Sequence, residues 1–345
     1  MKRRWLYAGI AAVGTLLVCL ILFYLAPARR EARQELVVWY AESECASKQM
    51  RALAARCEKQ TGLRVVTVGY PDEDALAAAC AEGRPDLLWC SHLRAAEIAE
   101  SGLAALPEGI ASPVRTPEGF YPLGARLPLL LRDPARLPET PRSLDALLTS
   151  GEKDVLAAES WADLLYEGMA ALGRSMSGRS GADSASAEYV RLYNLLARAA
   201  YDGAIVNETP AADCVLHRRA AAAAVDSMEL AALGDKALAV DPLPLPEGAQ
   251  TRYAAVWMGF AVLRPEAPAQ RFLKWLSQKA QGTEAALSLG LAPTDPAGGE
   301  GKTELDKALL RAAAGALSGL DPGCSYLENR AECERRLRLS LDLLA

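Results

Sequence analysis

The stretch ELVVWYA at Glu35–Ala41, followed at once by Glu42, Ser43 and Glu44, decides the fold of this chain. It is a short apolar run rich in β-branched and aromatic residues, which predicts a buried strand. The polar residues behind it predict a loop where the strand ends. The chain therefore opens on a strand whose end carries hydroxyl and carboxylate groups.

The alternation of strand and helix continues beyond this point. Apolar residues at helical spacing predict a helix over 47–60, and Gly62 stands where a left-handed C-cap is expected. There follow a strand over 63–68, an alanine-rich helix capped by Asp74 and ending at Gly83, and a strand over 86–89. Such an order predicts a parallel sheet covered by helices on both faces, with ligands bound at the edge where the strands end.

The rest of the chain contains further elements of the same kind. Predicted helices cover residues 93–101, 144–148 with Ser143 as N-cap, 187–200, 268–281 with Gly282 as cap, 305–320 and 327–344. Predicted strands cover residues 237–246 and 255–263, the alanine run at 220–224 fits either element, and the Ser- and Gly-rich stretch at 175–186 predicts a loop.

Length and composition set the class of protein. The 345 residues are enough for two lobes of ordinary domain size once an N-terminal segment is set aside. Hydrophobic residues at 51% and charged residues at 23% are typical of a soluble globular body. The net charge of −5, without a basic block beyond the N-terminus, argues against nucleic acid as a partner.

The N-terminus predicts export. Lys2, Arg3 and Arg4 precede an apolar stretch over 6–26, which is long enough to span a bilayer. The small residues at 26–28 would permit cleavage as a signal peptide, but the length also suits an uncleaved membrane anchor, and both alternatives stay open. Either way, we expect the body at the extracytoplasmic face of the bacterial cell membrane.

Neither a metal site nor an enzyme is indicated. The eight cysteines are scattered without zinc-ligand spacing, although Cys324 and Cys333 could close a small disulfide loop. Zinc-helix, nucleophile-elbow and dinucleotide motifs are missing, and the GGEGKT run at 298–303 lacks the strand that feeds a phosphate loop. The sequence therefore predicts no catalytic residues, no metal and no cofactor.

Several blocks, in order, resemble one family. They read LVVWYAES at 36–43, CEKQTGLRVVTVGY at 57–70, GRPDLLWCSHLRAAEIAESGLAALP at 83–107, YPLG at 121–124, DGAIV at 202–206, HRRAAAAAVDSMELAAL at 217–233, VDPLPLPEG at 240–248 and RFLKWLSQKAQGTEAALSLGLAPT at 271–294. The chain is similar to the extracellular solute-binding proteins of ABC importers, family 1, of the type II periplasmic-binding-protein-like class. The region between about 148 and 187 matches nothing in that pattern.

The resemblance implies an α/β fold of two lobes, each a mainly parallel sheet flanked by helices, joined by crossing strands. Residues 1–34 would form the signal peptide or anchor with its linker. Residues 35–121 and 253–300 would form lobe 1, and residues 122–252 and 301–345 lobe 2 with C-terminal helices. Such receptors close their cleft around a small solute and hand it to the permease subunits of an ABC importer. We expect a monomer attached to the membrane, if at all, through its N-terminal segment.

The resemblance also implies which residues face the solute. The predicted contacts are Tyr40, Glu42 and Ser43 after the first strand, Trp89, Ser91 and His92 at the end of the third, Tyr121 at the hinge, Asp226 and Met228 in lobe 2, and Trp257 after the return crossover. A Trp in an apolar run is more often a core residue than a ligand contact, which is the alternative for Trp89 and Trp257. A lone histidine such as His92 is more often a polar loop residue, which is the alternative there.

A sugar or oligosaccharide is the favoured solute, because aromatic and carboxylate residues follow the strands. A ferric ion or an oxyanion is the alternative within the family. A ferric site would require paired tyrosines, and Tyr189, Tyr193 and Tyr201 are not adjacent. Two other hypotheses do not involve import. One is a membrane-tethered solute sensor or adaptor of the same fold, and the other is a secreted hydrolase that uses Glu42, Glu44 and His92.

Overall fold

The computed structural model describes residues 35–99, 102–159, 164–165, 168–169, 171–172, 187–233, 238–249, 252–314 and 316–319. The N-terminal apolar segment, the loop predicted at 175–186, the helix predicted at 327–344 and the Cys324–Cys333 pair lie outside these residues. Within them, no helix combines the length and the apolar character needed to cross a membrane.

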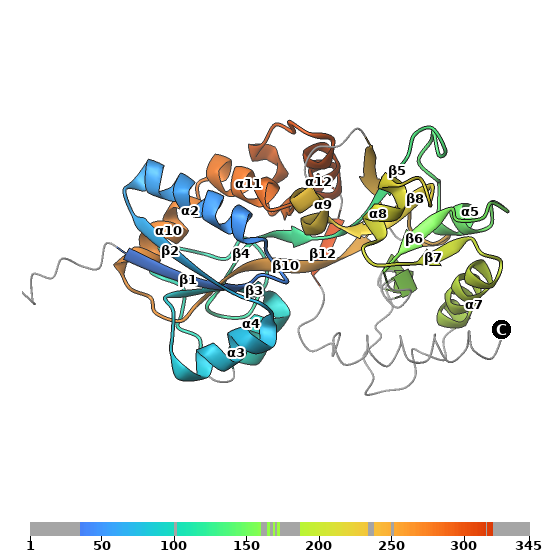
Figure 1. Ribbon diagram of the computed structural model, residues 1–345. Helices are drawn as coiled ribbons and strands as arrows, with labels where there is room; N and C mark the ends of the chain where they lie inside the picture. The colour runs from blue at the N-terminus through green and yellow to red at the C-terminus, as the bar shows by residue number, and fades with distance from the viewer. Residues whose placement is uncertain are drawn as a thin grey trace, which may run out of the picture.

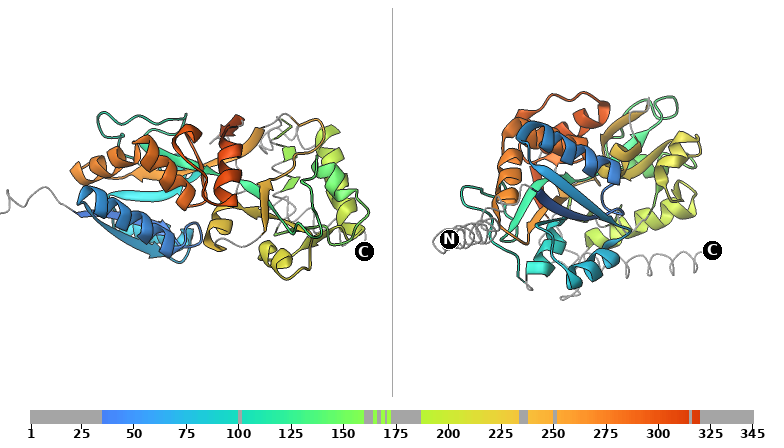
Figure 2. Two further views of the ribbon diagram at one scale, coloured as in Figure 1. Left: turned by 90° about the horizontal axis from the view of Figure 1, so that it is seen from above. Right: turned by 60° about the vertical axis from the view of Figure 1, so that its left-hand side comes forward.

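Two lobes lie side by side, each built on its own sheet (Figures 1 and 2), which confirms the predicted α/β fold class. We call the unit around the seven-stranded sheet lobe 1 and the unit around the five-stranded sheet lobe 2. Lobe 1 has the strand order β11-β4-β10-β3-β1-β2, with β12 beside β10, and lobe 2 has the order β7-β6-β8-β5-β9.

The strands of lobe 1 are β1 (Glu35–Ala41), β2 (Arg64–Tyr70), β3 (Leu87–Ser91), β4 (Phe120–Arg126), β10 (Arg252–Val262), β11 (Ala292–Pro293) and β12 (Ala316–Gly319). Those of lobe 2 are β5 (Pro128–Arg132), β6 (Leu156–Ala158), β7 (Ile205–Asn207), β8 (Ala222–Asp226) and β9 (Ala239–Pro242). In lobe 1, β1 pairs in parallel with β2 and β3, and β10 runs antiparallel between β3 and β4. In lobe 2, β6 pairs in parallel with β7 and β8. The alanine run at 220–224, which fitted either a helix or a strand, therefore leads into and forms part of β8, a central strand of lobe 2.

Helices cover both faces of the lobe 1 sheet. The helices α2 (Ser47–Thr61), α10 (Ala267–Leu276) and α11 (Lys279–Ser288) lie on one face, and α3 (Glu73–Glu82) and α4 (His92–Ala99) on the other (Figure 1). Lobe 2 carries α5 (Leu144–Leu148), α7 (Ala187–Tyr201), α8 (Ala211–Leu216) and α9 (Ser227–Leu233). The last described helix, α12 (Glu304–Ala314), contacts β9 of lobe 2 as well as β11 and β12 of lobe 1.

The helix caps in the structure match the predicted caps at two positions and differ from the prediction at a third. Gly62 takes the left-handed conformation, with φ of 70°, and Ser143 accepts a hydrogen bond from the backbone N–H of Ala146, as predicted. The cap of α3 is Asp72 rather than Asp74, because the Asp72 carboxylate accepts from the N–H of Ala75 at 2.8 Å. Asp74 lies in the first turn of that helix.

The single helix predicted over 268–281 is wrong. The chain breaks at Ser277 and Gln278 and starts the new helix α11, so Gly282 lies inside a helix and caps nothing. A Cβ atom at Gly282 would lie 2.5 Å from the carbonyl oxygen of Leu276, which explains why a glycine occupies this tight corner. The helix predicted over 305–320 also ends early, at Ala314, and residues 316–319 form the strand β12.

The lobes are joined where β4 runs into β5. Leu127 alone separates the two strands, and its N–H and carbonyl both bond to Ser227, the first residue of α9, directly after β8. A buried cluster of apolar side chains passes through this crossing, from Phe120 in lobe 1 through Leu127 to Ala223 in lobe 2 and Leu309 of α12. The predicted lobe bounds stay a prediction; β4, over its whole length, belongs to the first sheet.

Candidate functional site

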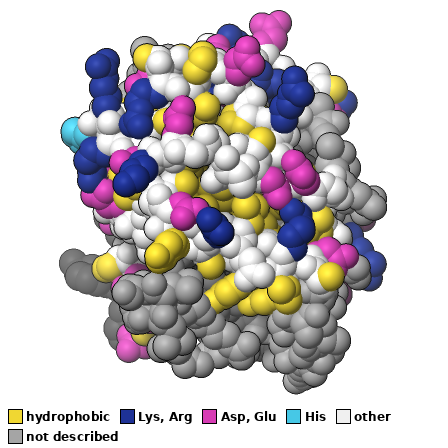
Figure 3. Space-filling view, turned by 90° about the vertical axis from the view of Figure 1, so that its right-hand side faces the viewer, with side chains coloured by type: hydrophobic (Ala, Val, Ile, Leu, Met, Phe, Trp, Pro, Cys, Tyr) yellow, Lys and Arg dark blue, Asp and Glu magenta, His cyan; other side chains and the backbone are white. Residues whose placement is uncertain are grey.

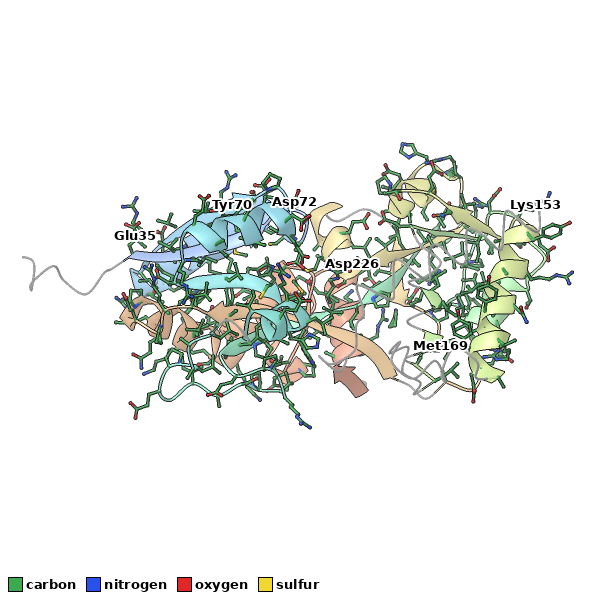
Figure 4. The ribbon with its side chains drawn as sticks, turned by 90° about the horizontal axis from the view of Figure 1, so that it is seen from below. Glu35, Tyr70, Asp72, Lys153, Met169 and Asp226 are labelled. Atoms are coloured by element: carbon green, nitrogen blue, oxygen red, sulfur yellow. The ribbon has the colours of Figure 1, made fainter. Side chains whose placement is uncertain are left out.

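The edges at which the strands of the two sheets end face each other. Arg126 is the last residue of β4, on the edge where the parallel strands β1, β2 and β3 also end, and Asp226 is the last residue of β8. Their side chains form an ion pair, with 2.7 Å between Arg126 Nε and Asp226 Oδ2. Figure 4 shows Asp226 in the middle of the molecule and Asp72 at the inner end of lobe 1. This is the edge at which open α/β sheets bind ligands.

Loops after β1 and β2 build the lobe 1 side of this edge. The N–H of Glu42, just after β1, donates to the carbonyl of Tyr70 at the end of β2, which holds the two loops together. Glu42 and Ser43 are both exposed here. Glu42 accepts a hydrogen bond from Ser47, whose hydroxyl also lies 2.6 Å from the buried phenol of Tyr40. Tyr40 therefore supports the loop from below.

A pair of carboxyl groups lies next to this loop. Glu44 comes from the β1–α2 loop and Glu73 is the first residue of α3, and their side chains share a hydrogen bond. Burial, then this bond and the charge of Glu73, raise the pKa of Glu44 to about 8, although Arg126 and Arg94 act in the opposite direction. Arg94 is itself paired with Glu97. The edge thus holds a proton between two acids near neutral pH.

Glu44→Gln is expected to flatten the dependence of folding stability on pH. The pKa of Glu44 in the folded chain, about 8, is above its ordinary value of 4.5. Its stabilising contribution is therefore complete below pH 4.5 and is lost as the pH rises to about 8, by at most about 1.4 kcal/mol per pH unit. Thermal melts across this range should show a smaller decline for Glu44→Gln than for the wild type. Glu266→Gln, at the exposed start of α10, is the control, and an equal decline in all three would contradict the assignment.

Lobe 2 presents a second acidic group at its own strand edge, which faces that of lobe 1. Glu229 in α9 lies near Asp226 and near Glu159, which follows β6. Burial, followed by the charges of Glu159, Asp226 and Asp213, raises the pKa of Glu229 to about 7. Within the described residues, the Oε1 atom of Glu229 is buried and makes no hydrogen bond. Both sides of the edge therefore carry carboxyl groups that hold protons more tightly than usual.

The other predicted contacts lie in the interior rather than at the edge. Trp89 has no exposed surface and packs edge-on against Phe260, with 5.0 Å between ring centroids. Every residue of β3 is buried because helices cover both faces of the sheet. In this structure Trp89 accordingly has the core placement that the alternative predicted. The side chains of Tyr121, Met228 and Trp257 are also buried.

Ser91 and His92 shape the backbone at the end of β3. The hydroxyl of Ser91 accepts a hydrogen bond from the N–H of Arg94 and so caps α4. His92 is 1% exposed, and its Nδ1 accepts from the N–H of Trp257 at 3.1 Å, which ties α4 to β10. Tyr121 lies on β4 opposite Phe260, inside lobe 1 and away from the crossing at Leu127. Of the ten predicted contacts, the structure leaves Glu42, Ser43 and Asp226 the most accessible.

Several residues at the edge escaped the sequence prediction. They are Glu73, Arg94, Arg126 and Glu159, each at or just beyond the start of a helix or the end of a strand. Arg126 carried the clearest signal, because it is the charged residue between the apolar runs of β4 and β5. Over the part of the chain that the structure describes, no group of three His, Cys, Asp or Glu residues could hold a metal ion. The cysteines described there are free thiols.

The far end of lobe 2 shows no concentration of one charge. Figure 3 looks onto this end, and the Lys and Arg side chains on its described surface are interspersed with Asp and Glu. A surface that binds the phosphate backbone of nucleic acid gathers its basic residues on one face. The described part of this face lacks such a patch.

Comparison with known proteins supports the fold. No protein-family model matches the chain, and no curated protein matches it by sequence. Among solved structures it is similar to the cyclic α-maltosyl-1,6-maltose binding protein from Arthrobacter globiformis, with a TM-score of 0.67 and 14% sequence identity. The match covers 88% of this chain and 93% of that one. At this identity the likeness establishes a shared two-lobed fold.

Proposed function

We propose that the chain is an extracytoplasmic solute-binding receptor that delivers a small solute, a sugar or oligosaccharide, to an ABC importer. The observation that carries this proposal is the pair of facing strand edges, linked by Arg126 and Asp226 beside the crossing strands. Two lobes joined by crossing strands can close around a solute, and binding then shifts the open population toward the closed one.

The chemistry of the edge suits a hydroxyl-rich solute. Ionised carboxylates accept hydrogen bonds from hydroxyl groups, and a protonated carboxyl such as Glu44 can also donate one. The similar structure is that of a protein named for binding a cyclic maltosaccharide, which supports the same class of solute here. The acidic groups on both sides disfavour an oxyanion. Tyr189 and Tyr193 stack on each other along α7 rather than at the strand ends, which disfavours a ferric site.

A thermal-shift screen of the full-length chain tests this proposal. Linear and cyclic maltosaccharides should raise the melting temperature, because a ligand at 100 times its dissociation constant stabilises the folded state by about 2.7 kcal/mol. Amino acids, polyamines, oxyanions and ferric citrate should not. A rise in melting temperature with oxyanions or ferric citrate alone would mean that the solute is not a sugar. No rise with any class of solute would contradict the receptor function.

Substitutions at the edge should then weaken binding of the sugar found in the screen. Glu42→Gln and Asp226→Asn are expected to lower its affinity by about 5- to 150-fold, which corresponds to 1–3 kcal/mol for a hydrogen bond to a charged group. Stability should change by less than about 1 kcal/mol, because Glu42 is exposed and the Arg126–Asp226 pair is one-third exposed. Titration calorimetry measures the affinity, with Glu266→Gln as control. Unchanged affinity in both variants would move the site away from this edge.

The partner can be identified separately. Recovery of the tagged chain from membranes should bring down the permease subunits of an importer if the chain serves transport. A sensor kinase as the main partner would instead favour the membrane-tethered sensor.

A further inference from the structure

A groove runs along one face of lobe 1 between α3 and α4. Its volume is about 580 Å³, within the range of about 300–1,000 Å³ that small-molecule sites occupy. Leu88 and Cys90 of β3 form its floor. Its walls include Glu44, Glu73, Leu76, Ala77, Cys80 and Ile98. Figure 4 looks onto this face, with Asp72 marking the end of α3 beside lobe 2.

The groove is apolar along most of its length because α3 is built from small residues. The side chains of Ala77 and Ala81 are too small to fill it. Leu76, Leu88 and Ile98 therefore line an open channel. The lining extends from Glu73, the first residue of α3, to Arg84, beyond its last. At about 1.5 Å per residue, the ten residues of α3 make the channel roughly 15 Å long. An extended octyl chain fits within that length.

The two ends of the groove differ in chemistry. At the inner end, the carboxyl groups of Glu44 and Glu73 share a hydrogen bond in a partly buried position. Arg94 also reaches this end, but its guanidinium is engaged by Glu97. At the outer end, Glu82 and Arg84 are exposed and of opposite charge. The inner end is therefore the one that offers acceptors, and a group with several N–H donors and a positive charge complements it.

We propose that this groove binds an amphiphile with a primary amine head, held between Glu44 and Glu73, and a hydrocarbon tail lying over Leu88 toward Ile98. The ammonium donates to both carboxyl groups and takes the place of the proton they share. The tail lies over the buried floor of Leu88 and covers the partly exposed side chains of Cys80 and Ile98, and this burial of apolar surface is the main favourable contribution to binding. The groove meets the strand edge of the proposed function at Glu44 and Glu73, but its apolar channel along α3 extends away from that edge.

Cys80 provides a direct readout, because its free thiol lines the groove and is partly exposed. Octylamine should slow the reaction of Cys80 with N-ethylmaleimide, measured on the Cys80 peptide of the full-length chain by mass spectrometry. At ten times its dissociation constant, octylamine should slow the reaction about tenfold. Octanoate and octanol, which have the same tail, should protect far less. Equal protection by all three would show unselective apolar binding and overturn the proposal, as would no protection by octylamine.

Two alanines of α3 give a matched pair of variants. Ala77→Leu fills the groove and should abolish protection by octylamine, whereas Ala78→Leu, on the exposed side of the same helix, should preserve it. Glu73→Gln should weaken octylamine binding and leave octanol unaffected. Protection that persists in Ala77→Leu would place octylamine elsewhere. The sugar-dependent thermal shift should stay unchanged in Ala77→Leu, so the failure of one site is distinguishable from the failure of the other.

Discussion

Replacing Trp89 with alanine is expected to lower the free energy of unfolding by about 3–5 kcal/mol, the usual cost of removing a large buried aromatic side chain. The Trp89 ring is fully buried and contacts Phe260, which in turn packs edge-on against Phe272 of α10 with 5.1 Å between centroids. Removing it leaves a cavity between the sheet and its covering helices. Chemical denaturation followed by circular dichroism measures the loss.

Two further variants separate the core role of Trp89 from a ligand role. Trp89→Phe should cost much less, because it keeps an aromatic ring beside Phe260 and removes an indole N–H that has no partner among the described residues. Trp39→Ala, at a partly exposed ring beside Tyr70, should also cost less. If Trp89→Ala kept its stability and lost affinity for solute, the ring would instead be a contact in the cleft.

Gly259→Ala is expected to destabilise the protein by about 3 kcal/mol, the upper part of the usual range for overpacking. A Cβ atom at this position would lie 2.1 Å from the carbonyl oxygen of Tyr121 and 2.8 Å from the Cα of Pro122. Both are backbone atoms of β4, which β10 and β11 hold on either side, so the strand cannot move away cheaply. The register of β10 on β4 shifts between Met258 and Gly259, and this irregularity brings the backbones together.

Gly83→Ala is the matched control for Gly259→Ala. Its backbone is extended, with φ of −153°, and a Cβ atom would approach only the ring edge of Trp39, at 3.3 Å. We expect a loss below about 1 kcal/mol for this variant. Melting temperatures compared side by side test the difference. Similar values for the two variants would mean that β4 can shift and that the close approach at Gly259 is not required.

The acidic edge and the groove meet at Glu44 and Glu73, so one substitution can report on both. Glu44→Gln should change how folding stability depends on pH and should also weaken the binding of octylamine. Asp226→Asn should lower only the affinity for the sugar. Measuring both variants in both assays tests whether the two sites are independent.

The sequence by itself determined the alternation of strands and helices in lobe 1. The apolar run at Glu35–Ala41, the cap at Gly62 and the cap at Ser143 could be predicted because they depend on residues a few positions apart. The break between α10 and α11 could not, since it depends on how closely the glycine of one helix approaches the end of the other. The strand β12 likewise forms only because β10 is there to pair with it.

Only the tertiary structure decided which polar residues form the site. Trp89 and Tyr40 lie within strands, only a few residues before the polar residues that follow each strand. Because helices cover both faces of the lobe 1 sheet, every side chain of the central strand β3 is buried, and no periodicity in the sequence distinguishes core from cleft. The pairs Glu44 with Glu73 and Arg126 with Asp226 are far apart in the sequence. The first pair meets because β1 and β2 end at one edge of the lobe 1 sheet, and the second because that edge faces the strand ends of lobe 2. Local patterns specify elements, whereas contacts between elements depend on how the sheets and the crossing strands place them in space.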